Sequence, residues 1–270
     1  MNPRLKTFFL FFFAFIFTAG LAIYQRMTGP TYPIRGKIVV NGETINYKLL
    51  RTSDDPGDQK LEIKIADTSI KGEFTFRRFR SHDSWTIVPM TREGENLVAF
   101  VPHQPPAGKV MYYISLNKTK LNIEPAILRY KGAVPNWIII PHVFFIFLAM
   151  FIAVVTLLEA IFKRKNIYLY TWLTVIFFFI SGIILGPLMQ EYAFGVLWTG
   201  WPFGHDLTDN KTLASLIIWI IALIVLRKNR DNRVWPVIAF VIMLVVFLIP
   251  HSVLGSEIDY TQAPKTEVGK

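Results

Sequence analysis

The chain has 270 residues, of which 52% are apolar and 23 are phenylalanine, and its mean hydropathy is +0.38. This composition indicates a membrane protein and excludes a disordered chain, a purely soluble enzyme and a coiled coil. The lack of cysteine excludes disulfides, zinc-thiolate sites, iron–sulfur clusters and thioether-linked haem. The net charge of +10 is interpreted through membrane orientation, so no nucleic-acid partner is inferred.

Five stretches are predicted to cross the bilayer, because a span needs about 20 mostly apolar residues. The first is interpreted as an uncleaved anchor within a segment 1–29, with a cleaved signal peptide as the alternative. The other four predict a transmembrane bundle over 134–254. The five stretches are 8–24, 137–162, 167–189, 213–226 and 234–251.

The short loops predict the orientation, because cytoplasmic loops retain lysine and arginine during insertion. Basic residues precede the first stretch and also lie at 163–165 and at 227–233, which places all three sites on one side. The amino terminus is therefore predicted inside and the carboxyl terminus outside. A bacterial inner (cytoplasmic) membrane is the simplest setting, with the large domain in the periplasm.

Residues 30–133 are predicted to form an extracytoplasmic antiparallel β-sandwich of about eight strands. Asn41 and Gly42 lie between two alternating stretches, 34–40 and 44–50, and favour a tight hairpin turn. The part from Trp85 to Tyr113 resembles an immunoglobulin- or fibronectin-type module, and this resemblance implies no activity. Residues 255–270 are predicted to be a polar, solvated tail on the same side of the membrane.

The densest charge cluster in this domain contains Arg77, Arg78, Arg80 and His82. It is interpreted as the solvated face of an edge strand, where charges block association between sheets. The alternative is a site for an anionic partner such as lipid head groups or an acidic polymer.

Three histidines are predicted to gather near the outer leaflet, where ionisable side chains are costly and often functional. His142 lies near the outer end of the second span, His251 ends the fifth, and His205 belongs to the aromatic outer loop 190–211. His142 and His251 could ligate a haem b, and all three could form a copper or other metal site. The alternative is a structural role at helix ends, since a proline precedes both His142 and His251.

Gly182 and Gly186 lie four residues apart on one face of the third span. Small residues at this spacing let a flat cofactor or a neighbouring helix come close, so both are candidate cofactor-binding positions beside the histidines. Simple helix packing is the alternative.

Two acidic features have ordinary interpretations. A calcium ion could be held by oxygen atoms of Asp206, Thr208, Asp209 and Asn210. The favoured interpretation is that Asp209 or Thr208 caps the amino-terminal end of the fourth span. Glu159 is predicted to pair with Lys163 one helical turn later.

The chain lacks the phosphate-binding, kinase, hydrolase and metalloprotease motifs, and the predicted spans carry no charge at mid-bilayer, which favours a protein that is not an enzyme. One hypothesis is a histidine-ligated redox or electron-transfer membrane protein. A second is a non-catalytic accessory or assembly subunit, and a third is an envelope ligand-binding protein without a cofactor. The predicted partners are the lipid bilayer and other membrane or periplasmic subunits.

Overall fold

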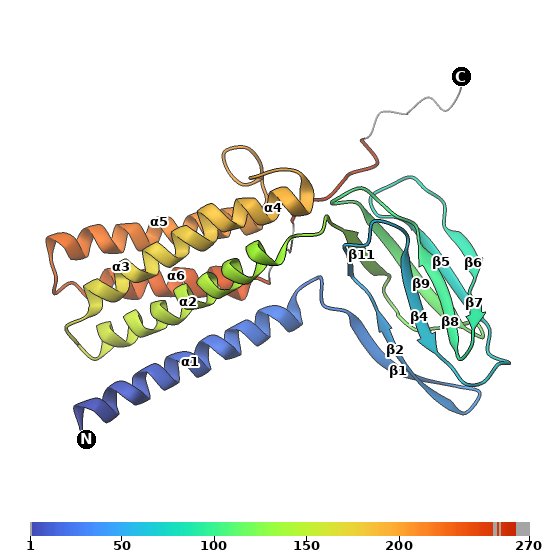
Figure 1. Ribbon diagram of the computed structural model, residues 1–270, viewed down its shortest axis with the longest axis horizontal. Helices are drawn as coiled ribbons and strands as arrows, with labels where there is room; N and C mark the ends of the chain where they lie inside the picture. The colour runs from blue at the N-terminus through green and yellow to red at the C-terminus, as the bar shows by residue number, and fades with distance from the viewer. Residues whose placement is uncertain (1, 251–252, 254, 263–270) are drawn as a thin grey trace. The chain divides into compact units, whose positions relative to one another are not determined.

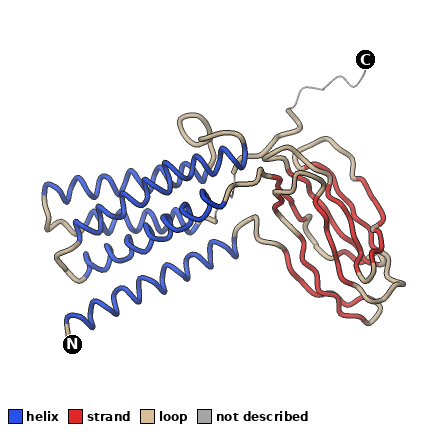
Figure 2. The backbone as a smooth tube through the Cα atoms, in the orientation of Figure 1, coloured by secondary structure: helices blue, strands red, loops and turns tan. Residues whose placement is uncertain are grey.

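The computed structural model describes residues 2–250, 253 and 255–262. The chain forms two compact units, each made from separate stretches of sequence. The first unit comprises Met1–Pro30 and Val134–Gly255, and the second comprises Thr31–Ala133 and Ser256–Lys270. Helices make up the first unit and strands the second, as Figure 2 shows.

The helices of the first unit lie alongside one another (Figure 1). They bury a large apolar cluster and a smaller one. Four helical stretches are long and apolar enough to cross a membrane, as expected for a multi-pass membrane protein. The helices are α1 (Pro3–Thr28), α2 (Asn136–Ile161), α3 (Ile167–Phe178), α4 (Gly186–Phe194), α5 (Leu207–Lys228) and α6 (Val234–Leu248), with the π-helix η1 (Phe179–Leu185) between α3 and α4.

The fifth predicted span is shorter than its sequence pattern suggests. Helix α6 has 15 residues and ends at Leu248, whereas the prediction extended to residue 251. A helix of that length rises about 22 Å, less than the roughly 30 Å of hydrocarbon in a bilayer. The prediction that His251 ends this span lies outside the described residues.

The third predicted span is one apolar stretch, Ile167–Phe194, but its backbone changes from α to π and back. Pro187 stands in the first turn of α4, directly after the π-helix. Because proline has no amide hydrogen, it removes one α-helical hydrogen bond at this point of the span. Short π segments inside α-helices are frequent at functional sites, which draws attention to Ser181 and Gly182.

The second unit contains three sheets. Strands β1 (Ile34–Val40) and β2 (Glu43–Leu49) form a hairpin; β4 (Gln59–Lys64), β8 (Asn96–Val101) and β7 (Thr91–Glu93) form a three-stranded sheet. The largest sheet has the order β3 (Thr52–Ser53), β11 (Ala126–Tyr130), β9 (Lys109–Leu116), β5 (Gly72–Arg78) and β6 (Thr86–Pro89), with β10 (Thr119–Lys120) paired to β9. Strands β3 and β11 are parallel, so the expectation of a wholly antiparallel domain was wrong at this pair.

The predicted hairpin turn is confirmed. Val40 pairs with Glu43, and Asn41 and Gly42 between them have φ angles of 51° and 81°. Asparagine and glycine adopt such positive angles more readily than other residues, which is why this pair predicted the turn.

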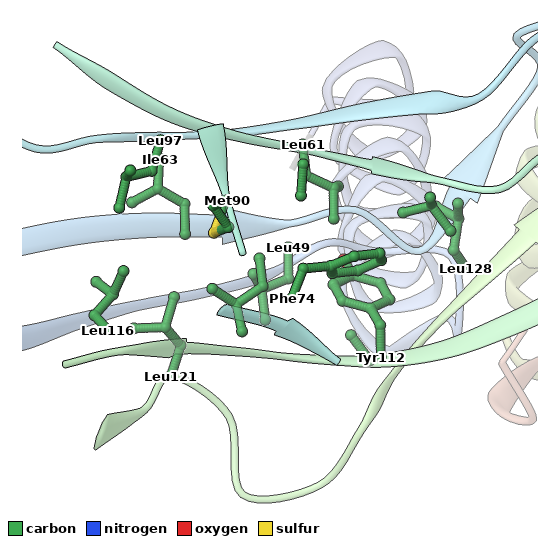
Figure 3. Close-up of a cluster of buried hydrophobic side chains, with 14 of the residues drawn as sticks. Leu49, Leu61, Ile63, Phe74, Met90, Leu97, Tyr112, Leu116, Leu121 and Leu128 are labelled. Atoms are coloured by element: carbon green, nitrogen blue, oxygen red, sulfur yellow. The ribbon is translucent and has the colours of Figure 1, made fainter. Parts of the chain in front are cut away.

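A single apolar core is shared by the three sheets. Alternate residues of β9 point into it, since the strand alternates between buried and half-buried side chains along its whole length. Figure 3 shows Phe74 and Tyr112 within this cluster, together with leucines from several strands. The phenolic oxygen of Tyr112 is satisfied there, because it donates to the carbonyl of Leu50 at 2.8 Å.

Candidate functional site

His142, the first predicted cofactor ligand, contacts the π-helix of the neighbouring span. Its Nδ1 lies 3.0 Å from the carbonyl oxygen of Ser181. A carbonyl oxygen only accepts, so Nδ1 carries a hydrogen in this contact. A histidine that binds a metal commonly donates its other ring N–H to a carbonyl in this way. The same contact also satisfies the helical backbone without any ligand.

Side chains occupy the space beside both predicted cofactor-binding glycines. A Cβ on Gly182 would overlap Cγ2 of Thr212 from α5, and one on Gly186 would lie 3.9 Å from Cε1 of His142. The two glycines therefore allow α5 and α2 to approach the third span closely. This packing leaves no room for a flat cofactor between Gly182 and Thr212.

His205 is exposed on the loop before α5, and His251 lies outside the described residues. Among the described residues, no three histidine, aspartate or glutamate side chains form a group that could hold a metal ion. The haem b and copper hypotheses for His142, His205 and His251 therefore stay predictions.

The aromatic outer loop is shorter than predicted and is held by carboxylates. Helix α4 continues to Phe194, so residues 195–206 form the loop. The cap of α5 is Asp206, which accepts from the Thr208 amide at 2.8 Å, and not Asp209 or Thr208 as predicted. Asp209 instead accepts from the amides of Thr199 and Gly200 at 2.8 and 2.9 Å. These oxygens are engaged by the backbone, which replaces the calcium alternative with a structural role.

Glu159 does not pair with its predicted partner. Its carboxylate pairs with Arg164 at 2.9 Å rather than with Lys163, and it accepts from the Asn166 amide at 3.0 Å. The helix ends at Ile161, and Lys163 has a positive φ of 49°. A pairing four residues apart requires a continuous helix, so the predicted ion pair was wrong.

The basic cluster spans the end of β5 and the loop that follows it. Strand β5 pairs with β9 up to Arg78, whereas β6 covers only its residues up to Phe76, so Arg77 and Arg78 have a strand partner on one side only. Arg78 donates two hydrogen bonds to Asp83 at 2.7 and 2.8 Å, which lowers the pKa of the Asp83 carboxyl. Arg77 and Arg78 therefore lie at a local edge of the sheet, as expected, whereas Arg80 and His82 lie in the turn and loop that follow β5.

The predicted solvated tail is in fact held on the sheet unit, and residues 256–262 are called the tail from here on. Glu257 forms ion pairs with Lys109 and, at 2.7 Å, with Arg80. The Ile258 amide donates to the carbonyl of Ala107 at 3.3 Å. Arg129 donates to the carbonyl of Ser256 at 2.5 Å.

Tyr260 anchors the far end of the tail. Its hydroxyl donates to Oε1 of Gln104 at 2.9 Å, and the Arg78 guanidinium lies 4.6 Å from the centre of its ring. The groups that receive the tail side chains are called the basic notch: Arg78, Arg80, Gln104 and Lys109. Only the charge complementarity between residues 77–80 and the acidic residues 257 and 259 could have suggested this contact from sequence.

A pocket of about 470 Å³ opens beside the basic notch. Arg78 and Gln104, which hold Tyr260, also line this pocket, whereas Tyr260 itself does not. The remaining lining residues combine apolar and polar side chains: Phe76, Arg77, Asp83, Ser84, Thr86, Pro102 and Val110.

A second feature, the aromatic row, crosses the outer face of the largest sheet. Arg77 lies 4.8 Å from the centre of the Trp85 ring, Trp85 lies 5.4 Å from Tyr113, and the Lys120 ammonium lies 4.4 Å from the centre of the Tyr113 ring. Two neighbouring aromatic rings thus lie between two cations. Cation–π contacts stabilise this arrangement and present flat rings beside positive charge.

In comparisons with protein families, curated proteins and solved structures, nothing matches this chain.

Proposed function

We propose that this protein is a non-catalytic accessory subunit, which is anchored by its helices and docks a partner protein through its sheet unit. One observation carries the proposal. Strand β6 ends the largest sheet, pairs with β5 on one side only, and exposes all four of its residues. Ile87 in this strand is 65% exposed.

An unpaired strand edge presents free amide and carbonyl groups, so it is a template for an added strand. Native proteins usually block such edges with lysine, proline or a bulge. At β6, Pro89 stands only at the end of the strand, and Ile87 and Val88 expose apolar surface. The neighbouring aromatic row supplies Trp85 and Arg77, residue types enriched in protein interfaces, as a source of specificity.

We further propose the topology that the basic loops predict. Lysine and arginine at 163–165, between α2 and α3, and at 227–233, between α5 and α6, lie at the same ends of the helices. Retention of these charges in the cytoplasm would place the sheet unit outside, in the periplasm of a bacterial cell, as an immunoglobulin-like sandwich domain.

The experiment replaces Ile87 with lysine and measures the size of the gently solubilised complex by size-exclusion chromatography with in-line light scattering. Lysine on an edge blocks strand addition, so Ile87→Lys should release the chain from its complex. Ile123→Lys is the matched control, because it makes the same change at a residue that is 93% exposed but lies in the bend between β10 and β11, outside any strand. It should leave the complex intact.

Two results would contradict the proposal. A wild-type chain that elutes without any partner protein would favour an envelope ligand binder. An unchanged complex in the Ile87→Lys variant would show that the partner docks elsewhere.

A further inference from the structure

The tail is bound as a surface peptide rather than as part of the core. Residues 256–260 are half-buried, run as an irregular segment, and stand outside the apolar core of the sheet unit. Its fixed points are the ion pairs of Glu257, the hydroxyl and ring contacts of Tyr260, and two bonds to its backbone. Polar contacts at a surface exchange readily with those of another ligand, because they bury little apolar area.

The notch recognises a short pattern. Lys109 and Arg80 receive one carboxylate, and Gln104 and Arg78 receive a phenol three residues later. Between them, the carbonyl of Ala107 accepts a backbone amide, which any residue except proline supplies. The pattern is therefore an acidic residue followed by tyrosine at the third position, as in Glu257-Ile-Asp-Tyr260.

We infer that the basic notch is a binding site for an acidic, tyrosine-bearing peptide segment of a partner protein, and that the tail is its built-in occupant. The pocket supports replacement of the tail by a partner. It opens beside Arg78 and Gln104, and Tyr260 does not line it, so a longer peptide gains contacts there that the tail lacks. This inference goes beyond the docking edge at β6 and rests on different contacts.

The tail competes from within the same molecule. A tethered ligand acts at an effective concentration of about a millimolar, so a free peptide of equal affinity displaces it only at comparable concentration. Vacating the notch removes this competitor. The Glu257→Ala/Tyr260→Ala double variant, called the vacated chain from here on, should thus bind free peptide far better than the wild-type chain.

The direct test uses the full chain in detergent and a labelled synthetic peptide with the sequence of residues 256–262, Ser-Glu-Ile-Asp-Tyr-Thr-Gln. Fluorescence anisotropy should give an apparent Kd at least about tenfold lower for the vacated chain than for the wild type. Thr261→Ala/Gln262→Ala is the matched control, because both side chains bond Asp259 of the tail itself, and it should behave as the wild type.

Two further variants test whether the notch is the site. Lys109→Ala in the vacated chain should weaken peptide binding about tenfold, because a charge-assisted contact is lost. Lys64→Ala removes the same charge from another surface of the unit, where Lys64 pairs with Glu95, and should leave binding unchanged. Equal effects of these two variants, or equal Kd values for the vacated and wild-type chains, would overturn the inference.

A second measurement keeps the test decisive if the double variant does not fold. A carbodiimide should join Lys109 to Glu257 within one wild-type molecule, because the two groups are in direct contact. The unlabelled peptide at millimolar concentration should lower the yield of this cross-link. An unchanged yield would overturn the inference, and so would a cross-link between molecules, which would make a second copy the source of the tail.

Discussion

Glu257 and Lys109 form an ion pair although 148 positions separate them in the chain. The two side chains are only 19% and 16% exposed, so water screens the pair less than it screens a fully exposed one. The pair fixes the chain after its last helix onto the start of β9.

Removal of the Lys109 charge should destabilise the protein measurably. Lys109→Met keeps the length of the side chain and leaves the Glu257 carboxylate with Arg80 alone, so we expect a loss of about 1 to 2 kcal/mol. Lys64→Met is the control, because its pair with Glu95 is largely exposed and should contribute little to stability. Thermal unfolding in detergent measures both, and equal losses would contradict the importance of partial burial.

Gly182 should tolerate no side chain unless α5 gives way. Gly182→Ala places a methyl group against Cγ2 of Thr212, and overpacking of this kind costs about 1 to 3 kcal/mol. Thr212→Ser removes that methyl group, so it should restore stability in the Gly182→Ala background. Gly20→Ala in α1 is the control, since its Cβ meets nothing within 4 Å. No rescue by Thr212→Ser, measured by thermal unfolding, would reject the packing explanation.

The free energy of unfolding should fall at alkaline pH, because the buried Tyr130 then loses its proton. Its hydroxyl donates to the carbonyl of Val101 at 2.7 Å, and burial raises the pKa of Tyr130 from 10.0 to about 12. A raised pKa stabilises the fold below pH 10, and this contribution disappears as the pH rises towards about 12. Tyr130→Phe should lower the free energy of unfolding by about 1 kcal/mol at neutral pH. Between pH 10 and 12, the free energy of unfolding of this variant should decline less than that of the wild type.

Denaturant unfolding across this pH range checks the effect of Tyr130. Tyr113→Phe, on the half-buried face of β9, is the control and should follow the wild-type pH dependence. Parallel curves for Tyr130→Phe and the wild type would contradict the role of Tyr130.

The histidine hypothesis predicts a chromophore or a metal. Reduced-minus-oxidised absorption of the purified protein should then show a Soret band, or metal analysis should find a stoichiometric ion. His142→Ala should abolish that signal while membrane insertion is kept. Absence of both signals from the wild-type protein would reject the haem b and copper hypotheses.

Local patterns in the sequence predicted the elements that depend on local chemistry. The apolar stretches are long enough to dictate helices that can cross a bilayer, whatever surrounds them. Asn41 and Gly42 predicted their turn because the required φ angles depend on these two residues themselves. Partners of charged side chains were predicted poorly, since Glu159 and Arg78 each pair with a residue that the helix or strand pattern does not select.

The amino-acid sequence by itself determined that this is a multi-pass membrane protein with a strand-rich unit, because hydrophobic length and alternation are properties of consecutive residues. Only the tertiary structure decided that β5 lies inside its sheet, that Thr212 fills the space beside Gly182, and that the tail occupies the basic notch. These relationships join residues far apart in the chain. They depend on how strands and helices pack, which no local pattern encodes.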